Sequence, residues 1–162
     1  RRGLHRRAIR GKEASLMAVR LSGPPAGIRG ARVDTKLLKA RARTMLAQVA
    51  HRGSELSIAL VDDADIRELN ESWRGKRRAT DVLSFSLLEG EGVGHRGGLL
   101  GDVVISVETA ARQAAGRHRG LDEEVARLLI HGLLHILGHD HEDPADAKVM
   151  EAEQRRLWRA VA

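Results

Sequence analysis

The segment HGLLHILGHDH, residues 131–141, contains four histidines, and three of them have a spacing that could bind a metal ion. His131 and His135 are four residues apart, so on an α-helix they point within about 40° of each other and lie about 6 Å apart along the axis. Gly138 can adopt the left-handed backbone conformation that ends a helix and turns the chain back. The pattern therefore predicts that His131, His135 and His141 converge on one ion.

The alternative to a metal site is a set of core histidines satisfied by hydrogen bonds. Two imidazoles on one face of an apolar helix, followed by a third after a glycine, favour the metal, because each buried ring needs a compensating partner. Three imidazoles leave a tetrahedral zinc ion one open position for water, as in catalytic zinc sites. The chain has no cysteine, which excludes thiolate ligands, although three imidazoles also suit nickel or copper. Asp140 could accept a hydrogen bond from a ligand or cap the turn, and His139 is expected at the mouth of the site.

The histidine segment is close to the zinc-protease motif H-E-x-x-H-x-x-G-x-x-H, but Gly132 stands where such a protease has its catalytic glutamate. A metallopeptidase would therefore need an atypical base, for example Glu108. A zinc ion lowers the pKa of bound water toward ~7 and so provides hydroxide at neutral pH. Hydrolysis of a phosphodiester instead needs cations that stabilise the charge on the phosphoryl oxygens. A basic residue near the metal would favour that reaction.

The stretch WRGKRR, residues 73–78, supplies such cations. Arg74 is expected at the end of a helix, just before Gly75, where a loop can aim its guanidinium at a neighbouring site and hold a phosphate in bidentate fashion. We predict Arg74 as a catalytic and substrate-binding residue and Lys76 as a further substrate contact. For Arg77 and Arg78, which follow Lys76, the favoured interpretation is a turn exposed to solvent.

Hydrophobic periodicity and helix caps predict the elements that must position these residues. The helix that carries the histidines is apolar nearly all round, so it is expected to be central. Strands are expected at 18–22, 55–61, 82–86 and 99–106, and helices are expected to follow the caps Asp34, Asp62 or Asp63, Ser106 or Thr109, Asp122, and Asp143 with Pro144.

This order of elements, β-α-β-α-β-β-α-α-α, predicts a single α+β domain. A small mixed sheet of about four strands would pack with about five helices, and the Gly-rich stretch 87–98 would be a hairpin loop. The chain has only three aromatic residues, Trp73, Phe85 and Trp158. Each lies at a position expected in the core, so few aromatic platforms are expected for stacking nucleic-acid bases.

The basic character of the chain is concentrated at its start. The net charge is +6, but residues 1–53 hold 14 Lys and Arg against 2 Asp and Glu, whereas residues 54–162 hold 14 against 20. Residues 1–16 have no apolar periodicity and are expected to be a disordered basic extension, which leaves 17–162 as one domain. No apolar run reaches the ~20 residues needed to span a bilayer, so we expect a cytoplasmic protein without membrane contact.

Three ordered motifs give a resemblance to a known family. LNESWRGKRRATDVLSF (69–85), LLGDVVIS (99–106) and HGLLHILGHDH (131–141) resemble the YbeY family of bacterial endoribonucleases that mature ribosomal RNA. The similarity extends from roughly Met17 to the end of the chain. His139 and Ser86 depart from the family pattern, which usually has Tyr and often has Pro at these positions.

The resemblance implies a zinc-dependent endoribonuclease for single-stranded RNA. It further implies a role in 16S ribosomal RNA 3′-end maturation and ribosome quality control, with contacts to small-subunit components. By motif position, one zinc ion would be held by His131, His135 and His141, and Arg74 would be the functional arginine. The main alternative is a non-catalytic ribosome-assembly factor stabilised by its metal, and a metallopeptidase is less favoured.

Overall fold

The computed structural model of the protein describes residues 17–49, 53–88 and 98–162. The predicted disordered extension at 1–16 and most of the predicted hairpin loop lie outside the described residues. None of the helices in the described ranges is long and apolar enough to cross a membrane. These ranges contain the strands β1 (Met17–Ser22), β2 (Ser54–Val61), β3 (Val82–Ser86) and β4 (Leu99–Ser106), and the helices α2 (Thr35–Gln48), α3 (Asp63–Arg74), α4 (Val107–Gly116), α5 (Leu121–Ile136) and α6 (Pro144–Val161).

The four strands form one mixed sheet in the order β1-β2-β4-β3. β1 pairs with β2 and β2 with β4 in parallel, whereas β3 and β4 are antiparallel neighbours joined by the Gly-rich connection. The predicted α+β fold, its element order and its mixed sheet are therefore confirmed. β3 lies at one edge of the sheet, and this edge proves to be next to the functional groups.

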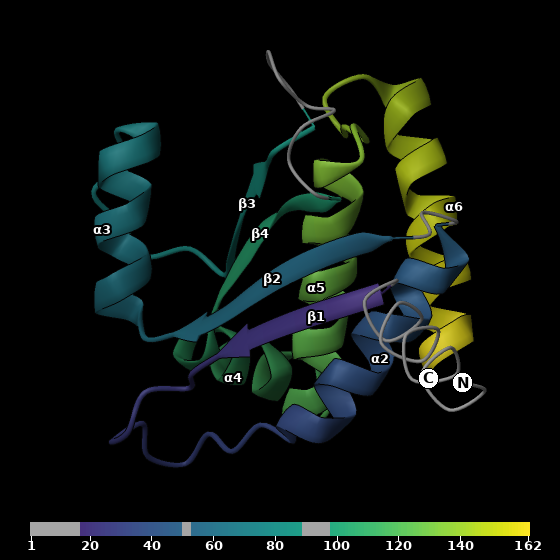
Figure 1. The fold of residues 1–162 in the computed structure, drawn as a ribbon. Coiled ribbons are helices and arrows are strands. Elements are labelled where there is room, and N and C mark those ends of the chain that lie inside the picture. The colour runs from purple at the N-terminus through teal and green to yellow at the C-terminus, as the bar shows by residue number, and fades with distance from the viewer. Residues whose placement is uncertain (1–16, 50–52, 89–97) are drawn as a thin grey trace, which may run out of the picture.

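The two faces of the sheet are covered very differently (Figure 1). The main core joins α2, α4, α5 and α6 to strand residues such as Ile58 and Ile105, and α5 crosses its centre as expected. The opposite face carries α3 above a small cluster of buried residues, Ile66, Leu83 and Val104. Each strand contributes side chains to both faces, because successive side chains point to opposite sides of a strand.

Most of the predicted caps are confirmed. The side chains of Asp34, Asp62, Ser106 and Asp143 each accept a backbone N–H in the first turn of the helix that follows. Such bonds satisfy donors that have no partner inside the helix. The cap predicted at Asp122 is wrong, because Gly120 is the N-cap of α5 and has no side chain to act as a cap. Asp122 lies within the first turn, where its carboxylate accepts the backbone N–H of Asp34 at 2.9 Å and so links α5 to the start of α2.

The core position predicted for Trp73 is also wrong, because 70% of this side chain is exposed. Ile66 and Asn70, at the same helical spacing, are buried as the periodicity predicts. Trp73 lies in the last turn of α3, at the sheet edge formed by β3, and meets the Phe85 ring edge to face, with centroids 5.9 Å apart. The contact with Phe85 therefore covers only a small part of this side chain.

Candidate metal centre

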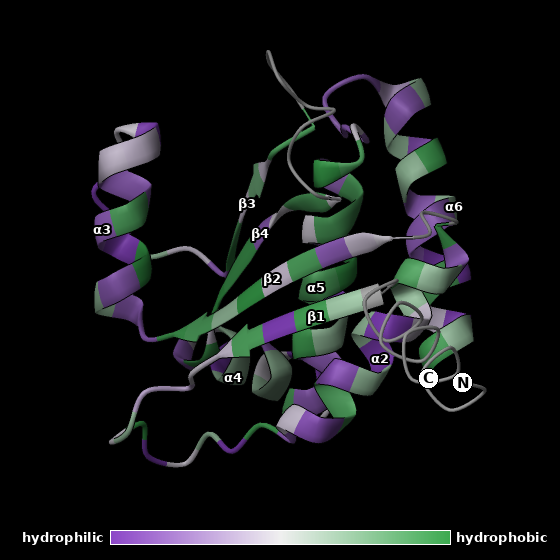
Figure 2. Cartoon of the chain, viewed as in Figure 1, coloured by the Kyte–Doolittle hydropathy of each residue, from purple (hydrophilic) through white to green (hydrophobic). Residues whose placement is uncertain are grey.

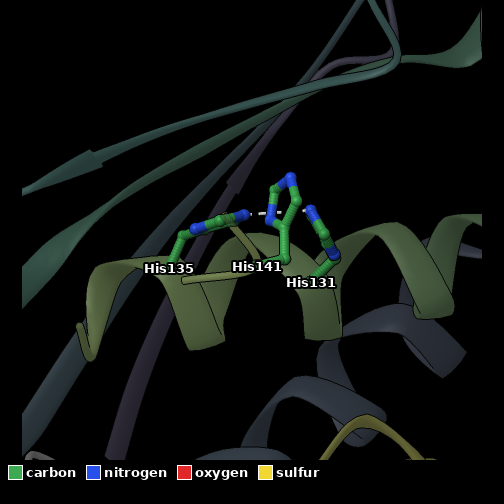
Figure 3. Close-up of side chains that lie close together, drawn as sticks. All are labelled: His131, His135 and His141. Carbon is green, nitrogen blue, oxygen red and sulfur yellow. Dashed lines mark hydrogen bonds between the residues drawn. The ribbon is translucent and has the colours of Figure 1, made fainter. Parts of the chain in front are cut away.

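The three predicted histidines lie together at the end of α5 (Figure 3). One nitrogen from each of His131, His135 and His141 lies within 4.8 Å of the other two. The Nε2 atoms of His131 and His135 are only 3.0 Å apart. Each His Nε2 would lie at ~2.0–2.1 Å from a zinc ion, so this separation suits two ligands of one cation. The three side chains thus converge on one point, as the sequence predicted.

The end of α5 brings His141 back toward the helix. Gly138 has a φ of 95°, a left-handed conformation that glycine adopts readily. Its N–H donates to the His135 carbonyl at 3.0 Å, and the His139 N–H donates to the Leu134 carbonyl at 2.9 Å. This pair of bonds is the Schellman motif that ends many helices. The carboxylate of Asp140 then accepts the His141 N–H, so it caps the turn, which was one of its two predicted roles.

The environment favours the neutral form of two of these imidazoles. Burial lowers the pKa of His131 and His135 below the ordinary value of 6.5, and the charges of neighbouring histidines lower it further. The nearby carboxylate of Asp81 acts in the opposite direction on the pKa of His131. A neutral imidazole has a free lone pair for a cation, so protons compete little with a metal ion for these two ligands at pH 7.

Two contacts hold the imidazoles from behind. The side-chain amide nitrogen Nε2 of Gln154, on α6, lies 2.7 Å from Nδ1 of His131. The backbone of His139 acts on His135 and partly offsets the lowering of its pKa. Rotation of this amide by half a turn would place its oxygen toward Nδ1–H, and Nε2 of His131 would then carry the free lone pair that binds a metal. Gln154 was not predicted, although a signal was present: it is a polar residue in the stripe that Met150, Leu157 and Val161 form on α6.

Gly132 lines the cavity that contains the histidines and is packed closely against the sheet. A Cβ atom there would lie 2.8 Å from Cγ1 of Val103, closer than such atoms approach. The sheet therefore fills the space that a glutamate would need, which is a packing reason for the missing protease base. Glu108, the alternative base, accepts the backbone N–H of Asp63 at 2.9 Å and does not line the cavity that contains the histidines.

The histidines open into a cavity of about 640 Å³ that also contains the predicted cations. Arg74 and Lys76 line it, as do Ser84 and Ser86 of β3. Ser86 also donates from its hydroxyl to the Ile136 carbonyl at 3.1 Å, which ties the edge strand to the end of α5. The cavity thus brings together Arg74, Lys76 and the three histidines. These five are the site residues predicted from the sequence.

The loop that carries these cations is fixed by Asn70. This residue is almost fully buried, its side chain donates to the Arg78 carbonyl at 2.9 Å, and its own carbonyl accepts the Lys76 N–H at 3.3 Å. Gly75 ends α3 in the left-handed conformation, with a φ of 67°. Arg77 forms an exposed ion pair with Glu71 and does not line the cavity. His139 is half-buried and lines the cavity.

The fold and this site define a class of protein. An α+β domain in which three convergent imidazoles share a cavity with two cationic side chains has the groups of a metal-dependent hydrolase of phosphate esters. Comparison with known proteins identifies the family: the family model described as Endoribonuclease YbeY matches residues 29–162. The chain belongs to the YbeY family of endoribonucleases.

Individual relatives agree with the family match. A protein of Anaeromyxobacter dehalogenans (strain 2CP-C) named Endoribonuclease YbeY is 50% identical over 145 residues, which cover 89% of this chain and 72% of that protein. A relative of the same name from Myxococcus xanthus (strain DK1622) is 54% identical over 125 residues, covering 75% of this chain and 42% of that protein. The solution structure of TM1509 from Thermotoga maritima has a similar fold, with a TM-score of 0.61 at 26% identity and 88% coverage of both chains.

Proposed function

We propose that this chain hydrolyses phosphodiester bonds within single-stranded RNA, using one zinc ion held by His131, His135 and His141. The observation that carries the proposal is the shared cavity, which places three convergent imidazoles beside Arg74 in a member of an endoribonuclease family. The choice of single-stranded RNA rests on the family resemblance.

The residues fit a divalent cation of the zinc type. The donor set consists of imidazoles alone, and two of them are kept neutral by their surroundings. With three protein ligands, a tetrahedral ion has a position left for water, which structural zinc sites lack. When bound, the ion would activate a water molecule at neutral pH and attract phosphoryl oxygens.

Arg74 and Lys76 act on the substrate rather than on the ion. Arg74 is exposed and lines the cavity, so its planar guanidinium can bind two phosphoryl oxygens as negative charge develops on them. Lys76, two residues further on, provides a second positive charge for the RNA backbone.

The biological setting follows from the family alone. Within this proposal the chain acts in the cytoplasm on ribosomal RNA, in 16S 3′-end maturation and ribosome quality control, and contacts small-subunit components. Within the same proposal, residues 17–162 form a catalytic domain and residues 1–16 a basic extension.

Metal removal and return test the proposal. Purified protein is treated with a chelator and assayed on a labelled single-stranded RNA, then assayed again after zinc, nickel or copper is added. We expect cleavage to disappear and to return best with zinc. Arg77→Ala serves as a control, because this arginine pairs with Glu71 outside the cavity. If the zinc-loaded protein leaves the RNA intact, the non-catalytic assembly factor becomes the better explanation.

A further inference from the structure

Trp73 is exposed in a way that packing does not explain. With 70% of its side chain exposed, it is the most exposed large hydrophobic residue in the described ranges, ahead of Val149 at 55%. A tryptophan buries more apolar area than almost any other side chain, so leaving it in water forgoes a large stabilisation. Its ring is also oriented, because Phe85 meets it edge to face at an interplanar angle of 68°.

This indole is next in the chain to a residue of the proposed reaction site. Trp73 immediately precedes Arg74, which lines the metal cavity, and both belong to the last turn of α3. The left-handed Gly75 and the hydrogen bonds of Asn70 fix the turn that follows, so the backbone that carries Trp73, Arg74 and Lys76 is held in place. β3, the edge strand, separates Phe85 under the indole from Ser84 and Ser86 on the cavity side.

The charges around Trp73 indicate which partner would cover it. Arg74, Lys76 and Arg78 are all exposed within five residues of the indole. An apolar partner surface would gain nothing from these cations, whereas a nucleic-acid strand presents flat aromatic bases joined by anionic phosphates. Base stacking on an aromatic side chain combined with a basic groove is the usual way in which proteins bind single strands.

We propose that Trp73 is a stacking platform for a base of single-stranded RNA next to the scissile phosphate, and this rests on the function proposed above. The phosphate lies in the metal cavity beside Arg74, and the strand passes the edge of the sheet so that a neighbouring base stacks on the indole. A base within a duplex already has stacking partners on both faces. Trp73 therefore contributes to selection for single strands, and it does so with little sequence preference, because every base has a π-face.

Tryptophan fluorescence provides a direct test. The chain has two tryptophans, so Trp158→Phe leaves Trp73 as the sole tryptophan. Chelator-treated protein of this variant is titrated with a short single-stranded RNA and with the same sequence as a duplex. We expect the single strand to quench the emission of Trp73 and the duplex to have little effect. Emission unchanged by saturating single strand would overturn the proposal.

Affinity measurements separate stacking from charge. We expect Trp73→Ala to weaken binding of the single strand by roughly tenfold, and Trp73→Phe to retain most of the affinity. Trp158→Phe, measured alone as the matched control, should bind as the unchanged protein does. A series of oligonucleotides, each lacking the base at one position, completes a double-mutant cycle with Trp73→Ala. At one position, removal of the base should lower the affinity as much as Trp73→Ala does. At that position, combining the two changes should lower the affinity no further.

Each remaining outcome has a definite meaning. If the unchanged protein binds and cleaves RNA but Trp73→Ala binds equally well, the stacking platform is wrong and the proposed function stands. If Trp73→Ala weakens binding equally at every position of the base-free series, the indole contacts something other than a base, and the platform is again wrong. If the unchanged, zinc-loaded protein neither binds nor cleaves RNA, the proposed function itself fails.

Discussion

The two faces of the sheet differ in how much they bury and in what they carry. The face covered by α2, α4, α5 and α6 holds the main core, and α5 on this face carries His131 and His135 (Figure 1). On the opposite face, Ile66 of α3 is buried against Leu83 and Val104 of the sheet, and the end of that helix carries Trp73 and Arg74. Figure 2 shows that α3 is largely hydrophilic, whereas α5 and the central strands carry many hydrophobic residues.

The difference separates two requirements of the proposed site. Metal ligands must hold a fixed geometry, and two of the three candidates lie on α5, which has more buried residues than the other described helices. Groups that bind an RNA strand must remain exposed, and they lie on a helix with a small core and an open end. If the two faces have these separate roles, substitutions on the packed face should change metal binding or stability, and substitutions at the exposed end of α3 should change activity alone.

The largest effect is expected on the packed face, at a metal ligand. His135→Ala should remove both zinc and RNA cleavage, because only two imidazoles would remain for the ion. Metal content by elemental analysis and a cleavage assay measure the two effects. Far-ultraviolet circular dichroism should be unchanged, since the His135 side chain is only partly buried. A variant that keeps a full equivalent of zinc would remove this residue from the metal site.

On the thin face, Arg74→Ala should separate activity from metal binding. We expect kcat to fall about 10²–10³-fold, as when one group that stabilises transition-state charge is lost. Zinc content and unfolding midpoint should stay unchanged, because the side chain is exposed. Single-turnover cleavage with saturating RNA measures the effect, with Arg77→Ala as the matched control. Normal cleavage by the Arg74 variant would exclude the arginine from the mechanism.

Core substitutions compare the two faces in stability. Leu129 and Ile66 are both fully buried, the first in the main core and the second in the small cluster. Replacing a buried Leu or Ile by Ala costs about 2–5 kcal/mol, and the cost is smaller where the surroundings can collapse. We expect Leu129→Ala near the upper end and Ile66→Ala near the lower end in urea unfolding. Equal losses would mean that the α3 face is packed as firmly as the other.

A smaller effect is expected behind the metal ligands. Gln154→Met keeps the side-chain volume but removes the hydrogen bond to His131, and loss of such a support typically costs about 10–100-fold in metal affinity. Competition with a zinc-binding dye measures the affinity, and Gln154→Glu should restore it. Gln48→Met is the matched control, because its amide also reaches α6 but bonds to Arg156. Affinity unchanged in Gln154→Met would show that His131 needs no such partner.

The smallest effect concerns pH. Burial and the charges of neighbouring histidines lower the pKa of His131 and His135 in the folded, metal-free protein below the ordinary value of 6.5. The unfolded chain therefore binds protons first, and stability that is present above pH 6.5 is lost as the pH falls through the lower folded values. Urea unfolding of metal-free protein between pH 7.5 and about 5 should show this decline. His131→Gln should flatten it.

The sequence was sufficient where local chemistry decides the outcome. Asp34, Asp62 and Asp143 are caps because their carboxylates reach nearby N–H groups, and the histidines converge because helix geometry and Gly138 bring them together. The sequence was insufficient where the outcome depends on which residues of another helix or strand pack against a side chain. Periodicity placed Trp73 on the sheet-facing side of its helix, but in the fold only Phe85 of the edge strand meets its ring, and the side chain stays exposed. Gln154 reaches His131 only through the packing of α6 against α5.

All three candidate ligands come from a stretch of eleven residues, 131–141. An ion bound there ties together a very short length of chain, so it removes little conformational freedom from the unfolded protein. The unfolded segment also keeps several imidazoles within reach of an ion, which further weakens the link between metal binding and folding. A metal ion at this site would therefore stabilise the domain little, and within the proposed function its contribution would be to reactivity.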